Sequence, residues 1–285
     1  MSTPLRAAGL HARGAGRVLL RGGGSLRERF ARGDDRLVFV VGSPRSGTTF
    51  LGRSLGALPG FVDLGEVPPL KALIPALADA PAEATARRIR RTLDTTRRLG
   101  LVGGRRAVEQ TPETAFVVGA LALAFPGASF VHIVRDGRDV ACSLLERGWL
   151  SAGRRGEDDA GLSYGAEARF WVEPERRAEF ARASDAGRAA WAWRRYVTAA
   201  AGAPAGRSFE VRYERMVDDP SAVARDLASF LGVGAADALL RPLRAAHGGS
   251  VGRHRDDLTP DQLDDVLAEA GGLLEALGYV ATARR

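Results

Sequence analysis

The segment Gly42-Ser-Pro-Arg-Ser-Gly-Thr-Thr49 has the residue types and the spacing of a phosphate-binding loop. Glycines at its two ends allow the backbone to turn sharply and to present N–H groups to an anion, while two threonine hydroxyls add donors. The lysine that normally reaches a triphosphate is missing, because Thr48 stands at its position. Arg45 is the nearest cation, so the sequence predicts an anionic ligand that is not handled as a conventional triphosphate.

A second candidate anion site lies in Val134-Arg-Asp-Gly-Arg-Asp-Val-Ala-Cys-Ser143. Arg135 follows an apolar run, and Ser143 lies on the helix expected next, on the face that points back to the same edge of a sheet. An arginine fork and a hydroxyl can bind one phosphate together. Arg138 and Asp139 are interpreted as solvated charges at the start of that helix.

These two segments require strands that end at one edge of a sheet. Short apolar runs alternate with helical patterns along the chain, which predicts a P-loop-containing three-layer α/β fold, a central parallel sheet flanked by helices, with its ligand at the carboxyl ends of the strands. Strands are predicted at 37–41, 61–64, 106–109, 129–134 and 208–213. Helices are predicted at 46–57, from Pro112 to about 125, and at 137–146, 221–231 and 260–277.

Composition excludes several classes of protein. The chain has 285 residues, of which 45% are hydrophobic, enough for one domain with a sizeable core. Its one cysteine, Cys142, rules out an internal disulfide and a thiolate-rich metal site and fits a reducing compartment. The net charge of +7 comes almost entirely from arginine, since Lys71 is the only lysine. Genome composition and selection for phosphate or sulfate binding explain this bias equally well.

Residues 1–35 form a basic leader rich in Gly and Arg. Arginines interrupt its short apolar pieces, and no apolar run in the chain approaches the roughly 20 residues that cross a bilayer. We therefore expect a cytoplasmic protein without an integral membrane segment and without a nucleic-acid partner. A frayed or locally packed leader is favoured over the alternative, a basic amphipathic helix on an anionic membrane.

The two anion-binding segments together resemble the donor-binding signature of sulfotransferases that use 3′-phosphoadenosine 5′-phosphosulfate (PAPS). Three further stretches are similar to that family, namely Glu109-Gln-Thr-Pro112, Tyr213-Glu-Arg-Met-Val-Asp-Asp-Pro220 and Ser250-Val-Gly-Arg-His-Arg255. The resemblance spans about 37–280 and implies a sulfotransferase with PAPS as donor and no metal.

Residue roles follow from that resemblance. It implies that the first loop holds the 5′-phosphosulfate and that the second segment holds the 3′-phosphate. Later residues would close over the nucleotide. The donor-binding residues implied in this way are Pro44, Arg45, Ser46, Gly47, Thr48, Thr49, Arg135, Ser143, Tyr213, Ser250, Gly252 and Arg253.

The form Pro44-Arg-Ser-Gly-Thr-Thr49, followed by Gly65-Glu66, is more similar to the bacterial and tyrosylprotein-type branch of the family than to the cytosolic small-phenol branch. In tyrosylprotein sulfotransferases the carboxylate of the Gly-Glu pair is the catalytic base. The cytosolic branch uses a histidine, and this chain has no histidine between His11 and His132. The resemblance therefore implies that Glu66 is the catalytic base. Arg45 is expected to be the catalytic residue that supplies positive charge to the transferred group. The competing interpretation of Glu66 is a surface carboxylate at the start of a helix.

Two residues depart from the family pattern. Gln110 replaces a lysine that helps to stabilise the transferring group in related enzymes, so we expect either Arg45 or a nearby arginine such as Arg106 to compensate. His254 stands where a tryptophan often occurs and could stack on the nucleotide. Neither His247 nor His254 has acidic partners at metal-ligand spacing in the sequence.

We predict a single domain at 36–285 with an insertion at about 148–200 that forms the acceptor pocket or its lid. The insertion contains Trp and Tyr residues at helical spacing, and such residues belong to a hydrophobic core more often than to a binding surface. These residues are Trp171, Trp191, Trp193 and Tyr196. The expected reaction is sulfuryl transfer to a hydroxyl, or less favourably an amine, of a small-molecule, glycan or lipid acceptor. The alternatives are a P-loop kinase or NTPase, with Asp136 as metal ligand, and a non-catalytic nucleotide-binding module. The sequence leaves the oligomeric state open.

Overall fold

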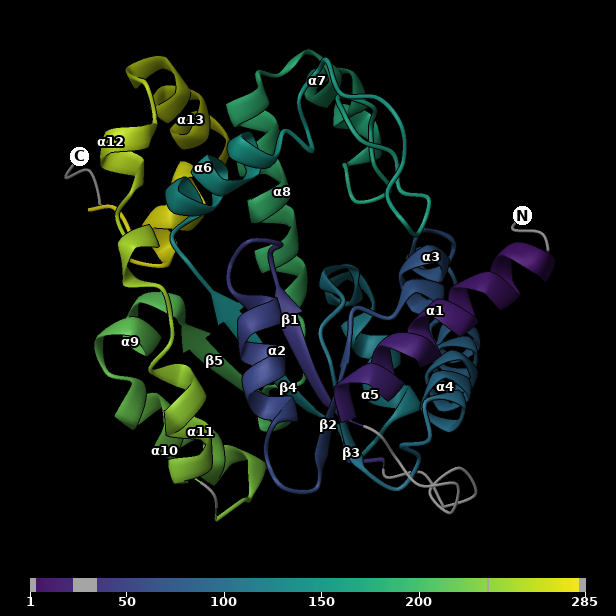
Figure 1. Ribbon diagram of the computed structural model, residues 1–285. Helices are drawn as coiled ribbons and strands as arrows, with labels where there is room; N and C mark the ends of the chain where they lie inside the picture. Colours follow the sequence, from purple (N-terminus) through teal and green to yellow (C-terminus); the bar gives the residue numbers. More distant parts are fainter. Residues whose placement is uncertain (1–3, 23–34, 235, 282–285) are drawn as a thin grey trace.

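A five-stranded parallel sheet forms the centre of the computed structural model, which describes residues 4–22, 35–234 and 236–281 (Figure 1). The strand order is β2-β3-β1-β4-β5, so β1 lies in the middle between β3 and β4. The strands are β1 (Val38–Gly42), β2 (Phe61–Gly65), β3 (Arg106–Glu109), β4 (Ser129–Val134) and β5 (Ser208–Arg212). All four strand pairings are parallel, as the apolar runs predicted.

Helices connect the strands and continue to the C-terminal region. The first part of the chain contains α1 (Pro4–Gly22), α2 (Thr48–Gly56), α3 (Pro68–Leu77), α4 (Ala82–Leu99), η2 (Pro112–Val117), α5 (Val118–Ala124) and α6 (Gly137–Arg147). The second part contains η3 (Pro174–Arg176), α7 (Arg177–Arg182), α8 (Asp185–Ala200), η4 (Ala205–Arg207), α9 (Tyr213–Asp218), α10 (Pro220–Leu231), α11 (Ala236–Leu243), η5 (Gly248–Ser250), α12 (His254–Asp257) and α13 (Pro260–Ala276). The η elements are 3₁₀ helices.

The sheet separates two apolar cores, which gives the predicted three layers. Side chains of β1 alternate between them: Phe39 packs in the core with α3, α4, α5, α8 and α13, and Val40 packs in the core with α2, α9, α10 and α11. Figure 1 shows α2 in front of the sheet and α8 behind it. Every residue of β1 is buried, as expected for the central strand of a doubly covered sheet.

Two helix starts differ from the predicted ones for local reasons. Helix α2 begins at Thr48 rather than Ser46, because Gly47 has a φ of 97°, in the left-handed region that precedes the helix. The helix predicted from Pro112 begins as the 3₁₀ helix η2, in which the Thr114 hydroxyl bonds to the Thr111 carbonyl at 2.6 Å. This tighter turn holds η2 close to the carboxyl edge of β3.

Part of the basic leader is the helix α1, which packs on the domain. Val18 is fully buried in the core that α3 and α4 share. Two arginines of α1 form ion pairs, Arg21 with Asp63 of β2 at 3.1 Å and Arg17 with Asp159 at 2.8 Å. Leu20 is 91% exposed on the outer face. None of the helices in the described ranges has the length and apolarity needed to cross a bilayer.

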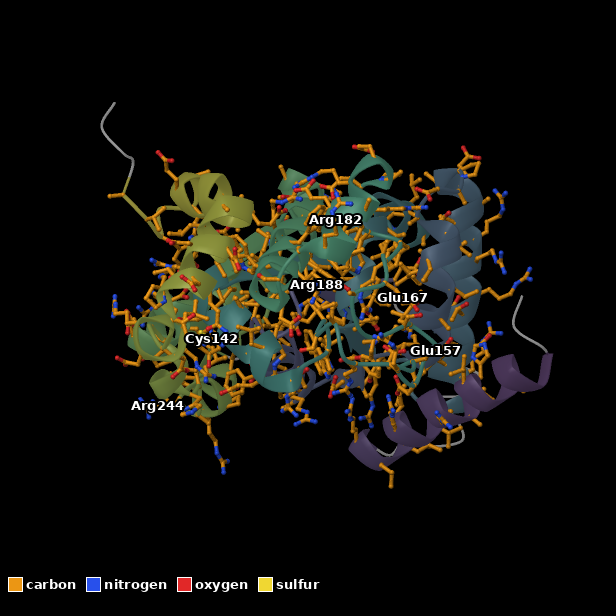
Figure 2. All side chains as sticks on the ribbon, turned by 90° about the horizontal axis from the view of Figure 1, so that it is seen from above. Cys142, Glu157, Glu167, Arg182, Arg188 and Arg244 are labelled. Carbon is orange, nitrogen blue, oxygen red and sulfur yellow. The ribbon has the colours of Figure 1, made fainter. Side chains whose placement is uncertain are left out.

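The long segment between α6 and α8 passes above the sheet's carboxyl edge (Figure 1). Seen from above, Glu157 and Glu167 of this segment lie toward the side of α1, and Cys142 and Arg244 lie toward the opposite side (Figure 2). This part of the segment therefore lies on the same side of the molecule as α1.

Candidate active site

The loop Gly42–Thr49 joins β1 to α2 at the carboxyl edge of the sheet, and its glycines are required by close neighbours. A Cβ atom on Gly42 would stand 2.4 Å from the Ile133 carbonyl oxygen, and one on Gly47 would stand 2.9 Å from the Tyr213 ring. Arg45 also has a positive φ, 70°, which is uncommon for a residue with a side chain. The first turn of α2 presents backbone N–H groups that have no partner within the helix. The loop is therefore built for an anion.

A cavity of about 860 Å³ opens beside this loop, and we call it the first cavity. It brings together residues that lie far apart in the chain: Arg45, Gly47, Thr48, Thr49, Arg135, Ser143, Tyr213, Ser250, Gly252 and Arg253. Two residues predicted for the same site are elsewhere. Pro44 lines a neighbouring cavity, and Ser46 is fully buried, with a hydroxyl that has no partner in the described ranges.

Arg135 directly follows β4 and is buried to 95% at the base of the first cavity. Its guanidinium donates to the Arg45 carbonyl at 3.2 Å and to the Ser250 carbonyl, and it lies 4.8 Å from the centre of the Tyr213 ring. The Nε atom is buried without a hydrogen-bond partner in the described ranges. A buried cation that keeps an unused donor fits an anionic group of a ligand.

The side chain of Arg45 reaches from the loop to α6. Its Nε donates to the Ser143 hydroxyl at 2.9 Å, and its guanidinium is 5.9 Å from the Trp149 ring centre. Burial lowers the pKa of Arg45, and the nearby Arg147 and Arg135 lower it further. The cations that crowd this corner produce a positive potential where a phosphate or sulfate would be stabilised.

The interpretation of Asp139 as a solvated charge is wrong, whereas Arg138 is partly exposed and pairs with Asp136 at 2.7 Å. Asp139 is fully buried and accepts hydrogen bonds from the backbone of Gly252 at 2.7 Å and of His254 at 3.0 Å. Asp139 also bonds to the His254 ring at 2.7 Å, and the His254 side chain is buried. Asp139 thus anchors the late loop over the first cavity, and His254 is part of that anchor and does not line the cavity.

One group of three residues in the described ranges could hold a metal ion, with ligand atoms of Asp136, Asp139 and His254 within 4.8 Å of one another. These atoms are already engaged. Asp136 accepts from the Arg138 guanidinium at 2.7 Å and from the Arg138 N–H at 2.9 Å, and Asp139 accepts the bonds described above. The group functions as a hydrogen-bonded clasp.

A second cavity of about 350 Å³ lies on the other side of the loop. It shares Arg45, Thr48 and Thr49 with the first cavity, and it extends beneath the 148–200 segment. Its remaining lining residues are Pro44, Glu66, Lys71, Pro112, Glu113, Leu144, Trp149, Leu150, Asp158, Asp159, Tyr164, Arg169, Trp171, Ala192 and Tyr196. Two cavities that meet at an anion-binding loop suit the transfer of a charged group from one ligand to another.

Glu66 follows β2 and lines the second cavity. The backbone beside it is fixed, because the Val67 N–H donates to the Thr111 hydroxyl at 2.9 Å. Glu66 does not cap α3, whose N-terminus has no side-chain cap. Its Oε2 instead accepts from Lys71 at 3.2 Å, and Oε1 has no hydrogen bond in the described part of the chain.

Lys71 of α3 lies among three carboxylates. Besides Glu66, it pairs with Asp158 of the overlying segment at 2.9 Å and approaches Glu113 of η2 at 3.9 Å. Burial alone would lower the pKa of Lys71, but the three carboxylates together raise it well above the usual range. Lys71 therefore remains charged and ties the segment above the cavity to its floor.

Gln110 lines neither cavity, and the expected compensation by Arg106 is not possible. Gln110 is buried against Gly52 of α2. Arg106, at the start of β3, donates to the carbonyls of Arg36 at 2.7 Å and Leu231 at 2.8 Å, at the opposite edge of the sheet. In the second cavity the cations are instead Arg45, Lys71 and Arg169.

Sequence reasoning missed Lys71, Glu113 and Arg169 as site residues. The only lysine of an arginine-rich chain was a usable signal, since a strongly hydrated point charge suits a site shared by three carboxylates. Of the aromatic residues, Trp171 and Tyr196 line the second cavity, whereas Trp191 and Trp193 are core residues on α8. No local pattern separates these two pairs.

Comparisons with known proteins agree with this geometry. The sequence model described as "Sulfotransferase family" matches residues 78–237, more than half of the chain. The sulfotransferase domain of the Synechococcus PCC 7002 olefin synthase is similar in structure, with a TM-score of 0.52 and 18% identity over 86% of this chain and 96% of that one. Sulfotransferase STF9 from Mycobacterium avium gives a TM-score of 0.51 and 16% identity over 99% and 88% of the two chains. A search of the curated proteins gives no match.

Proposed function

The chain belongs to the sulfotransferase family, and from this premise we propose that it transfers a sulfuryl group from PAPS to a hydroxyl of a small-molecule, glycan or lipid acceptor. An amine acceptor is less favoured. The observation that carries the proposal is the meeting of the two cavities at Arg45, Thr48 and Thr49. We assign the first cavity to the donor and the second to the acceptor.

PAPS would supply the sulfuryl group and a phosphate leaving group. The loop N–H groups and the hydroxyls of Thr48 and Thr49 are suited to its 5′-phosphosulfate. Arg135 and Ser143 are suited to its 3′-phosphate, a role supported by the unused Nε of Arg135 and by the lining of the first cavity. The loop that contains Ser250, Gly252 and Arg253 would close over the nucleotide.

Glu66 is proposed as the base that accepts the proton of the acceptor. Its position in the second cavity supports this role, as does the free Oε1 in the described part of the chain, while Oε2 is held by Lys71. Proton removal matters because sulfuryl transfer, like phosphoryl transfer, depends on positioning and charge stabilisation, with a base for the attacking hydroxyl. Arg45, at the boundary of the cavities, is proposed to stabilise negative charge that grows on the leaving oxygen.

The kinase or NTPase alternative is disfavoured by the surroundings of Asp136. A metal-binding aspartate must face the phosphates, whereas Asp136 is held by Arg138 through its side chain and backbone. Arg135 beside it would also repel a cation. A cytoplasmic location remains part of the proposal, on the sequence argument of a single cysteine, Cys142, which is free and buried.

The substitution Glu66→Gln tests the proposed base. Acceptors are first identified by incubating the purified protein and a metabolite extract with radiolabelled PAPS. Turnover of the Glu66→Gln variant should then fall by roughly 10²–10⁴ while donor affinity is unchanged, because glutamine keeps the shape but not the basicity. The acidic limb of the rate–pH profile should disappear as well.

The matched control is Glu83→Gln, which removes an exposed carboxylate from the first turn of α4, outside both cavities. It should leave the pH profile intact. Near-normal turnover of the Glu66→Gln variant would refute the assignment of Glu66 as the base. Glu66 would then be interpreted as a structural partner of Lys71.

A further inference from the structure

Two charged side chains in the second cavity have atoms without a partner in the described part of the chain. Glu113 is 5% exposed; its Oε1 accepts from the Tyr196 hydroxyl at 3.2 Å, but its Oε2 is buried and accepts nothing. Arg169, from the segment above, has a buried Nε that donates to nothing. Two side chains of the cavity lining therefore each keep one unused atom, an acceptor on Glu113 and a donor on Arg169.

Leaving such atoms without partners is costly, because each loses its bonds to water and gains none within the protein. Arginine cannot escape this cost by losing its proton. For Glu113 the cost is smaller, because it can take up a proton. Burial, the largest effect, raises the pKa of Glu113, while Lys71 lowers it. Both side chains line the second cavity, so a ligand bound there could provide the missing partners.

The formal charges around the cavity balance when every acidic and basic side chain is counted as ionised. The cations are Arg45, Lys71 and Arg169, and the carboxylates are Glu66, Glu113 and Asp158. The remaining carboxylate, Asp159, is paired with Arg17 of α1 at 2.8 Å. A charged acceptor would disturb this balance, whereas a neutral one that both donates and accepts hydrogen bonds would preserve it.

A hydroxyl group is neutral and can both donate to a carboxylate and accept from a guanidinium. Aromatic rings provide the remaining walls, from Trp149, Tyr164, Trp171 and Tyr196. Such rings can cover the C–H faces of a saturated ring. The volume of about 350 Å³ is at the lower end for ligand pockets, so it suits one such ring.

We propose that the acceptor is a neutral polyhydroxylated ring, such as a pyranose unit, in which one set of hydroxyls bonds to Glu113 Oε2 and Arg169 Nε while another hydroxyl faces Glu66. This inference rests on the proposed function, because it assumes that the second cavity holds the acceptor. Glu113 and Arg169 are then specificity-determining residues.

Binding of small probes in the absence of donor tests this inference without requiring sulfuryl transfer. The probes are the methyl glycosides of glucose, galactose and mannose, together with methyl glucuronide as anion, methyl glucosaminide as cation, and cyclohexylmethanol as a ring with one hydroxyl. Saturation-transfer NMR and the fluorescence of the cavity tryptophans report binding. At least one neutral glycoside should bind about tenfold more tightly than the other three probes.

Variants identify the residues responsible. Glu113→Gln and Arg169→Gln should each weaken binding of that glycoside about tenfold and leave cyclohexylmethanol unaffected. Arg155→Gln is the matched control, since Arg155 is exposed on the same segment and donates only to carbonyls of that segment. Affinity for 3′-phosphoadenosine 5′-phosphate (PAP) in the first cavity verifies that each variant is folded.

The inference is overturned if no glycoside binds better than cyclohexylmethanol, if the charged sugars bind best, or if neither variant weakens glycoside binding. If the Arg169→Gln variant then slowed turnover equally for all acceptors, Arg169 would be interpreted as a residue that stabilises the transferred sulfuryl group. Glycoside binding without any sulfuryl transfer would instead contradict the proposed function and leave the binding site for a polyhydroxylated ring standing.

Discussion

Arg45 and Ser143 are joined by a hydrogen bond of 2.9 Å from the arginine Nε to the serine hydroxyl. The bond links the loop after β1 to the helix α6 after β4, so it closes the wall between the two cavities. A guanidinium fixed in this way has little freedom to lose when charge develops beside it, which is the condition for preorganised stabilisation.

Arg45→Ala should therefore lower turnover more than donor affinity. Charge on the leaving oxygen grows only toward the transition state, so the interaction contributes mainly there. Arg45→Lys should restore part of the rate. Steady-state kinetics with PAPS measures both effects, and an unchanged turnover number with a raised Michaelis constant would make Arg45 a ground-state binding residue.

Arg135→Ala should weaken PAP binding by on the order of 2–4 kcal/mol, since it removes a charge-assisted contact to the 3′-phosphate. Adenosine 5′-phosphosulfate lacks that phosphate and should lose little affinity. Arg138→Ala is the control, because the Arg138 guanidinium bonds to Asp136 and to the Tyr279 carbonyl and does not line the first cavity. Equal losses for both nucleotides in calorimetry would contradict the assignment.

Lys71→Met should lower the free energy of unfolding by about 3–5 kcal/mol at neutral pH, because three carboxylates, of which Glu113 is buried, lose their lysine partner. Lys71→Arg should recover most of the loss. The deficit should shrink as the pH falls, because burial raises the pKa of Glu113 and a protonated Glu113 leaves less negative charge without a partner. Urea unfolding at two pH values provides the measurement, and an unfolding midpoint like that of the original protein would show that the network is not stabilising.

Glu109 should make the protein less stable as the pH rises from about 5 to 8. Burial, the largest effect, raises its pKa to about 8, although hydrogen bonds from Thr111 oppose the rise. The folded state thus holds a proton that the unfolded state releases near pH 4.5, so the unfolded state is favoured by increasing pH across this window. Glu109→Gln, which resembles the protonated form, should flatten the pH dependence of Tm between 5 and 8. If the variant keeps the original slope of Tm against pH, a group other than Glu109 causes the pH dependence.

The sequence predicted the fold because it depends on local patterns, and the family resemblance implied residues that the structure brings together in the first cavity. Apolar runs such as 37–41 reveal buried parallel strands, and parallel strands bring their carboxyl ends together, so Arg135 was placed beside the loop correctly. The single-domain boundary and the insertion at 148–200 remain predictions. The charged lining of the second cavity was largely missed, because Lys71, Glu113 and Arg169 meet through tertiary packing of α3, η2 and the overlying segment.

Burial also reversed some interpretations. Asp139 at the start of α6 has the residue type of a solvated helix-start charge, yet it is buried because the late loop folds back onto it. That loop is distant in the chain, so no local pattern indicates the contact. The leader illustrates the same limit: the burial of Val18 depends on a partner surface on α3 and α4.

Calorimetric titration of the purified protein with PAP, and separately with ATP and Mg²⁺, tests the central claim most directly. The account predicts that PAP binds at one site with micromolar or tighter affinity, that Arg135→Ala weakens this binding, and that ATP with Mg²⁺ binds at least tenfold more weakly. Tight binding of ATP that requires Mg²⁺, together with no measurable binding of PAP, would contradict the assignment of the first cavity to PAPS.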